Sequence, residues 1–145
     1  MLRKIAIYVL SMTMLVGASL ADSFDGPPKI VIKDNKGGMI GDFLAFRGFL
    51  ERYGITVVFD GPCISACTIL LTLPKETTCV TSNAQFLFHR AMHPNPEVEQ
   101  AATDVVFVHY PEWVQNFIIE KGGLTREFII MNSTYAKRYL PSCKK

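Results

Sequence analysis

The chain has 145 residues, of which 49% are hydrophobic, and it carries 15 basic against 13 acidic side chains. This length supports one domain with a single core and excludes a fused ATPase domain. The near balance of charge predicts no nucleic-acid partner, because such partners require a strongly basic surface.

Residues 1–21 have the pattern of a secretory signal peptide. Arg3 and Lys4 precede an apolar run over 5–16, and small residues follow up to Ala21. The run is shorter than the roughly 20 residues of a membrane-spanning helix. We therefore expect cleavage after Ala21, no stable membrane anchor, and a periplasmic or secreted bacterial protein. Loss of Arg3 and Lys4 leaves 13 basic against 13 acidic residues.

The segment after a polar leader (22–28) alternates between strand and helix patterns. A β-branched strand begins at Lys29, and an amphipathic helix is expected over 41–53, where Gly54 ends it. A strand over 55–59, an apolar helix over 66–73 and a strand over 86–89 follow. This order predicts an α/β domain over 29–145 that is built from βαβ units.

The C-terminal third is expected to be mainly helical. A polar, proline-bearing loop is predicted over 93–103, then helices over 105–119 and 124–131, separated by a glycine pair. The first helix carries aromatic residues at helical spacing, which fits both a core stripe and an oligomer interface. These are Phe107, Tyr110, Trp113 and Phe117.

A small-residue turn over 61–68 carries Ser65 between a strand and an apolar helix. A serine placed there lies at a helix N-terminus, where free N–H groups favour developing negative charge, as expected of a nucleophile. The competing interpretation is a serine that caps the helix without any chemistry.

His89 follows Ser65 by 24 positions and is the candidate general base, since histidine titrates close to neutral pH. Its alternative is a histidine packed on an aromatic strand. Gly37 and Gly38 end the first strand and are candidates to present oxyanion donors. The alternative interpretation of the glycine pair is a tight turn.

All four cysteines follow the signal peptide: Cys63, Cys67, Cys79 and Cys143. An even number in an exported chain predicts two disulfides, with three connectivities open. We expect Cys143 to tie the C-terminus to the body near the Ser65 turn. A zinc site or a redox pair competes with this interpretation, but the Cys-x-x-x-Cys spacing fits neither well.

The order strand, Gly-Gly, helix, strand, Gly-x-x-x-Ser-Ala, helix and Phe-His resembles the Clp protease proteolytic subunit and the wider ClpP/crotonase superfamily, over 29–89. More narrowly, Cys-x-Ser-Ala-Cys-Thr resembles secreted, cysteine-bearing relatives of that superfamily. The resemblance implies a spiral of βαβ units, a homo-oligomer, Ser65 as nucleophile, His89 as base and the glycine pair as oxyanion donors.

The chain departs from the family's pattern in its third catalytic residue. The Clp subunit orients its histidine with a downstream aspartate, but no aspartate follows Asp104 here. The nearest match is Asn132, since an asparagine can also orient an imidazole. The alternative is a helix cap or turn residue, which would leave a Ser-His dyad or an inactive relative.

These residues together predict an exported serine hydrolase, most simply a peptidase, acting on a peptide or acyl substrate. Ser65 would attack with His89 as base, while Gly38 and an N–H near Ala66 hold the oxyanion. We expect neither a metal nor a cofactor. A catalytically inactive binding or assembly module is the alternative, and an acyl-CoA enzyme of the crotonase type is a third choice that suits an exported chain poorly.

Overall fold

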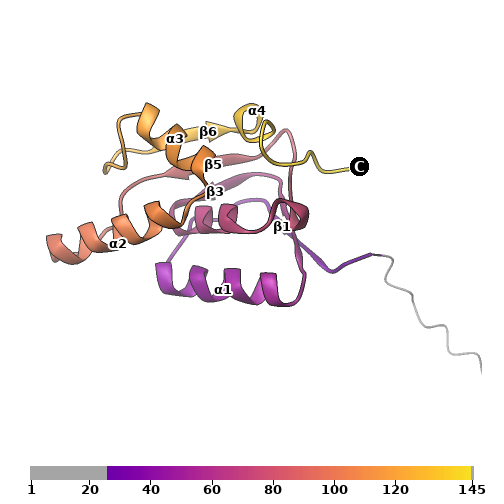
Figure 1. Cartoon of the computed structure of the whole chain (residues 1–145), viewed down its shortest axis with the longest axis horizontal. Helices are drawn as coiled ribbons and strands as arrows, with labels where there is room; N and C mark the ends of the chain where they lie inside the picture. The colour runs from indigo at the N-terminus through magenta and orange to yellow at the C-terminus, as the bar shows by residue number, and fades with distance from the viewer. Residues whose placement is uncertain (1–25, 145) are drawn as a thin grey trace, which may run out of the picture.

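The computed structural model describes residues 26–144, so the predicted signal peptide (1–21) and most of the predicted leader lie outside the described residues. The strands form two three-stranded sheets. In Figure 1, α1 (Ile40–Arg52) lies on one side of the strands, and the C-terminal helices α3 (Glu112–Glu120) and α4 (Ser133–Ala136) lie on the other. The predicted α/β class is confirmed.

The first sheet is parallel, in the order β1-β2-β4: β1 (Lys29–Ile32), β2 (Thr56–Phe59) and β4 (Thr78–Val80). Helix α1 (Ile40–Arg52) connects β1 to β2 and buries Leu50, close to the predicted bounds. Gly54 follows α1 with a φ of 61°, a conformation that glycine adopts without steric cost. The predicted strand-helix-strand unit is therefore present at the N-terminal end.

The second sheet has the order β3-β5-β6: β3 (Pro62–Ile64), β5 (Gln85–Phe88) and β6 (Ile129–Asn132). Strands β3 and β5 are parallel, and β6 is antiparallel to β5. Between β3 and β4 lie two 3₁₀ helices, η1 (Ser65–Thr72) and η2 (Lys75–Thr77). The predicted apolar helix is thus a 3₁₀ helix, and β3 and β4 are strands that the pattern did not predict.

The predictions of a loop over 93–103 and one helix over 105–119 are wrong. The structure has α2 (Pro96–His109) and α3 (Glu112–Glu120). Helix α2 begins in the expected loop because Asn95 accepts the Glu97 N–H as its N-cap, and a proline suits the first helical position. Pro111 separates the helices because it cannot donate a backbone hydrogen bond and disfavours a helical residue before it.

The predicted helix over 124–131 is also wrong, because the end of that segment is the strand β6. Ile129 and Ile130 are β-branched, and the register pairs Phe88 with Ile129 and Gln85 with Asn132. A short helix α4 (Ser133–Ala136) follows β6 directly. A free edge on β5 decided the conformation of this segment.

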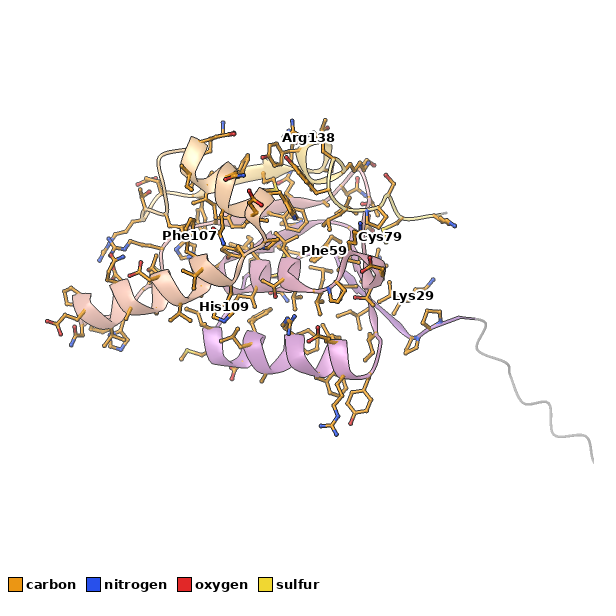
Figure 2. All side chains as sticks on the ribbon, in the orientation of Figure 1. Lys29, Phe59, Cys79, Phe107, His109 and Arg138 are labelled. Atoms are coloured by element: carbon orange, nitrogen blue, oxygen red, sulfur yellow. A yellow bond between two sulfur atoms is a disulfide. The ribbon has the colours of Figure 1, made fainter. Side chains whose placement is uncertain are left out.

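The core lies between the sheets and the helices, and Figure 2 shows side chains filling the interior around Phe59. Phe59 and Phe86 meet edge to face there, with ring centroids 5.0 Å apart. Of the predicted aromatic set, Tyr110 and Phe117 are buried, while Phe107 and Trp113 are partly buried against the core. This set therefore belongs to the core.

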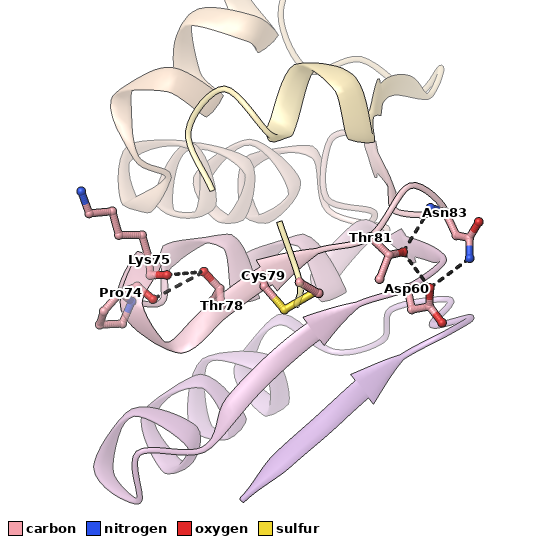
Figure 3. Close-up of a disulfide and its surroundings, with 8 residues drawn as sticks. Asp60, Pro74, Lys75, Thr78, Cys79, Thr81 and Asn83 are labelled. Carbon is pink, nitrogen blue, oxygen red and sulfur yellow. Dashed lines mark hydrogen bonds between the residues drawn. A yellow bond between two sulfur atoms is a disulfide. The ribbon is translucent and has the colours of Figure 1, made fainter. Parts of the chain in front are cut away.

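Two disulfides are present, as predicted: Cys63–Cys67 and Cys79–Cys143. The expectation that Cys143 ties the C-terminus near the Ser65 turn is wrong, because its partner Cys79 lies on β4 (Figure 3). The residues after α4 lie beside β4, where the Cys143 N–H donates to the Val80 carbonyl at 3.1 Å. The Ser65 turn instead has its own bridge from Cys63 to Cys67.

Over residues 26–144, no three or more His, Cys, Asp or Glu side chains are grouped to hold a metal ion. No helix in that range is both long and apolar enough to cross a membrane.

Candidate functional site

Ser65 occupies a backbone conformation that non-glycine residues rarely adopt. Its φ is 56°, and it is the only non-glycine residue within 26–144 with a positive φ. The residue lies where β3 passes directly into η1. Such a strained turn between a strand and a helix lifts a side chain away from the backbone, as in the nucleophile elbow of α/β-hydrolases.

The capping interpretation of Ser65 does not match this geometry. The N-cap residue of η1 is Ile64, and no side chain makes a cap hydrogen bond at this end of the helix. Ser65 is instead the first residue of η1 and is partly exposed. Its hydroxyl is therefore not used as a helix cap.

The glycine pair lies against the Ser65 turn. Asn35 bridges the two segments, since its N–H donates to the Pro62 carbonyl and its own carbonyl accepts from Ile64, both at 2.9 Å. A Cβ on Gly37 would come within 2.5 Å of the Ile64 carbonyl oxygen and 3.0 Å of the Ser65 Cβ. Only glycine fits at this position, which also has a φ of 82°.

The two glycines differ in what their N–H groups can do. The Gly37 N–H donates to Asn35 Oδ1 at 2.9 Å, so it is not free to bind an oxyanion, which corrects that prediction. Gly37 instead allows its segment to pack closely against the Ser65 turn. Gly38 lines the same cavity as Ser65. The Ala66 N–H lies in the first turn of η1, where amides lack an intrahelical partner. Gly38 and Ala66 are the remaining candidate donors.

A buried pair of hydroxyl groups, those of Thr68 and Tyr110, supports the Ser65 turn. Thr68 Oγ1 donates to the Ser65 carbonyl at 2.6 Å and lies 2.5 Å from the Tyr110 hydroxyl. Because Thr68 has only one hydroxyl proton, Tyr110 donates to Thr68. Burial raises the pKa of Tyr110 to about 12, so the phenol stays neutral and keeps the proton that it donates to Thr68.

His89 immediately follows β5 and is half-buried. Its imidazole packs edge to face against Phe128, with ring centroids 4.8 Å apart. Burial lowers the pKa of His89, although a hydrogen bond with the Arg90 backbone works in the opposite direction. The imidazole is therefore neutral at pH 7 and able to accept a proton.

Ser65, His89 and Gly38 line one cavity of about 300 Å³. The other lining residues are mainly apolar and come from the start of α1, the segment after β5, and α2: Met39, Ile40, Gly41, Ala91, Met92, His93, Val98 and Ala102. A smaller cavity of about 20 Å³ lies beside it and is also lined by Ser65, His89, Ala66 and Tyr110. The fold thus brings the predicted nucleophile, base and two oxyanion candidates together.

Asn132 is not part of this group. It lies opposite Gln85 in the β5–β6 register, at the far end of β5 from His89. Its side chain accepts the Tyr135 N–H at 3.0 Å and caps α4. The prediction that Asn132 orients His89 is therefore wrong, because the segment forms a strand whose register carries Asn132 away from the site.

Sequence reasoning missed the residues that support the site. Asn35 could have been found as an Asn-x-Gly turn, since asparagine side chains accept backbone N–H groups two residues on. Thr68 and Tyr110 lie 42 residues apart, and no local signal connects them. Phe128 was assigned to a helix that does not form.

Comparison with known proteins identifies a similar fold but does not assign the chain to a family. No protein-family model matches the chain, and no curated protein matches it. Among solved structures, one described as "Crystal structure of an Enzyme" aligns with a TM-score of 0.57 and 11% sequence identity, over 82% of this chain and 79% of that chain. At this identity the likeness shows a shared α/β fold.

Proposed function

We propose that this protein is an exported serine hydrolase, most simply a peptidase, of the ClpP/crotonase type. The observation that carries the proposal is the positive φ of Ser65, on a turn that shares a cavity with His89 and Gly38. Strained backbone at a cavity is a common property of catalytic residues. The motif order over 29–89 supports the superfamily, and the two disulfides are consistent with an exported, periplasmic protein.

The proposed reaction is acyl transfer to water. His89 accepts the Ser65 proton, and Oγ attacks the acyl carbon of the substrate, whose oxygen becomes an oxyanion held by the Gly38 and Ala66 N–H groups. Collapse of the intermediate expels the leaving group, which takes the proton from His89. Water, activated by His89, then hydrolyses the acyl-enzyme and releases Ser65.

A catalytically inactive binding module is the second candidate. The observation that favours it is the environment of His89, whose imidazole packs against Phe128. Asn132 lies too far along β6 to orient it. A histidine held only by aromatic packing is also what a structural role would require. The homo-oligomer implied by the resemblance stays a prediction for either candidate.

The test is labelling of the purified, disulfide-intact protein with a fluorophosphonate probe. We expect labelling of the native chain and none of Ser65→Ala or His89→Ala, with folding checked by circular dichroism. Ser142→Ala removes an exposed serine on the C-terminal segment and is the matched control, which should label like the native chain. Absence of labelling in the folded native chain would overturn the hydrolase and favour the binding module.

A further inference from the structure

Glu99 is a buried carboxylate that the proposed chemistry does not use. It lies in the first turn of α2 with 4% of its surface exposed. Burying a charge is costly unless partners surround it. Burial tends to raise the pKa of Glu99, but the His93 N–H, Arg126 and Arg90 outweigh this effect and lower it. The group therefore stays ionised among cationic partners.

The partners of Glu99 come from two segments, the one between β5 and α2 and the loop before β6. Arg90 Nε lies 2.8 Å from Glu99 Oε1, as an ion pair whose N–H is not aligned for a hydrogen bond. Arg126 Nη2 donates to Glu99 Oε2 at 3.2 Å, and the His93 N–H donates to the same oxygen at 3.4 Å. One carboxylate thus joins two positions of the segment after β5 to the loop before β6.

Each of these segments borders His89. Arg90 is the next residue, and its N–H donates to the Thr125 carbonyl at 2.7 Å. Arg126 lies two residues before Phe128, the ring that packs on the imidazole. The structure therefore connects both sides of His89 to a single group on α2.

A second contact from α2 holds the same segment. Thr103 Oγ1 accepts the Ala91 N–H at 3.0 Å and donates to the Glu99 carbonyl at 2.7 Å. Thr103 lies one helical turn after Glu99 and is also buried. The chain after His89 is thereby fixed at Arg90, Ala91 and His93 by one face of α2.

We propose that Glu99 is the positioning residue of His89, acting through Arg90 and through the Arg126 loop that holds Phe128 against the imidazole. It takes the place that the sequence assigned to Asn132, although it touches neither the imidazole nor the substrate. Its catalytic consequence rests on the proposed hydrolase, but the positioning itself is a property of the fold. A purely structural Glu99 would instead affect stability and leave the folded site unchanged.

The experiment compares Glu99→Gln with Glu97→Gln by NMR of the His89 imidazole. Both variants remove one negative charge from the first turn of α2, but Glu97 is exposed. We expect Glu99→Gln to weaken the nuclear Overhauser effect between His89 and Phe128. It should also lower the pKa of His89, because Arg90 and Arg126 lose their shared counter-charge. Glu97→Gln should match the native chain in both.

The rate of fluorophosphonate labelling is the second measurement. Misplacement of a catalytic group by about 1 Å can cost about 100-fold in rate, so we expect Glu99→Gln to label about 10- to 100-fold more slowly than Glu97→Gln. If the native chain does not label but the His89 signals respond to Glu99→Gln as expected, the proposed hydrolase is overturned, and the proposal that Glu99 positions His89 is supported. A folded Glu99→Gln with native His89 signals overturns the proposal.

A second variant removes only one partner of Glu99 and keeps the proposal testable if Glu99→Gln does not fold. The Arg126 side chain is 76% exposed, so Arg126→Gln leaves Glu99 paired with Arg90 and is expected to fold. It should weaken the contact between Phe128 and His89, whereas Lys121→Gln, an exposed charge on the segment after α3, should not. Equal His89 signals in Arg126→Gln and the native chain would also overturn the proposal.

Discussion

The two halves of the candidate site are built in different ways. The Ser65 half has a disulfide between Cys63 and Cys67, and Gly37 and the buried Thr68–Tyr110 pair pack against its strained turn. The His89 half has no disulfide and depends on side chains from α2 and the loop before β6. The difference is that a disulfide closes the Ser65 turn, whereas the position of His89 depends on non-covalent contacts with other segments alone.

The disulfides give the largest test of this contrast. Cys79–Cys143 closes a loop of 64 residues and Cys63–Cys67 one of four. In the chain-entropy model, their removal costs about 4 and about 2 kcal/mol respectively. We expect Cys79→Ala/Cys143→Ala to lower the denaturation midpoint more but keep native labelling while folded. Cys63→Ala/Cys67→Ala should cost less stability but slow labelling, and the reverse pattern would break the comparison.

The glycine pair provides the next test, with a control in the adjacent residue. Gly37→Ala places a methyl group 2.5 Å from the Ile64 carbonyl at a positive φ, whereas the nearest atom to a Cβ on Gly38 lies at 3.7 Å. We expect Gly37→Ala to cost about 3 kcal/mol of unfolding free energy and Gly38→Ala less than about 1 kcal/mol. Urea denaturation measures both. Equal losses of stability in the two variants would mean that Gly37 is not closely packed against the Ser65 turn.

The strain at Ser65 predicts a smaller difference. Ser65→Gly relieves the left-handed conformation and Ser65→Ala keeps it, so the glycine variant should be more stable by about 1 kcal/mol, although both lose the hydroxyl. Thermal unfolding of the two variants, followed by circular dichroism, checks this. If alanine is the more stable variant, the turn is not strained in solution.

The pH dependence tests the His89 half and has the smallest expected effect on stability. Because burial lowers the pKa of His89 below its ordinary 6.5, the neutral base persists to lower pH than in a free histidine. Labelling should be constant near pH 7 and fall as the pH drops through this lowered value. Stability should fall slightly below pH 6.5, because the unfolded chain binds the proton more readily. A labelling rate that does not change between pH 4 and 7 would exclude His89 as the base.

Some features follow from short-range sequence signals. The α/β class, α1 with its closing glycine, and the strands β1, β2 and β5 have clear sequence signals, and the even number of cysteines indicated two disulfides without fixing their connectivity. The small residues and the two cysteines of the Ser65 turn are equally local, since they lie within a few positions of one another. These elements could be predicted because neighbouring residues decide them.

The tertiary structure decided the rest. Ile129 and Ile130 form a strand because the edge of β5 is available to pair with them, and that register moves Asn132 away from His89. The partners of Glu99 lie between 6 and 27 residues away in the chain, and Thr68 meets Tyr110 across 42 residues. The periodicity of the sequence does not reveal contacts between residues so far apart in the chain. The sequence by itself therefore determined where the Ser65 turn lies, and only the packing of α2 and β6 around β5 decided what holds His89.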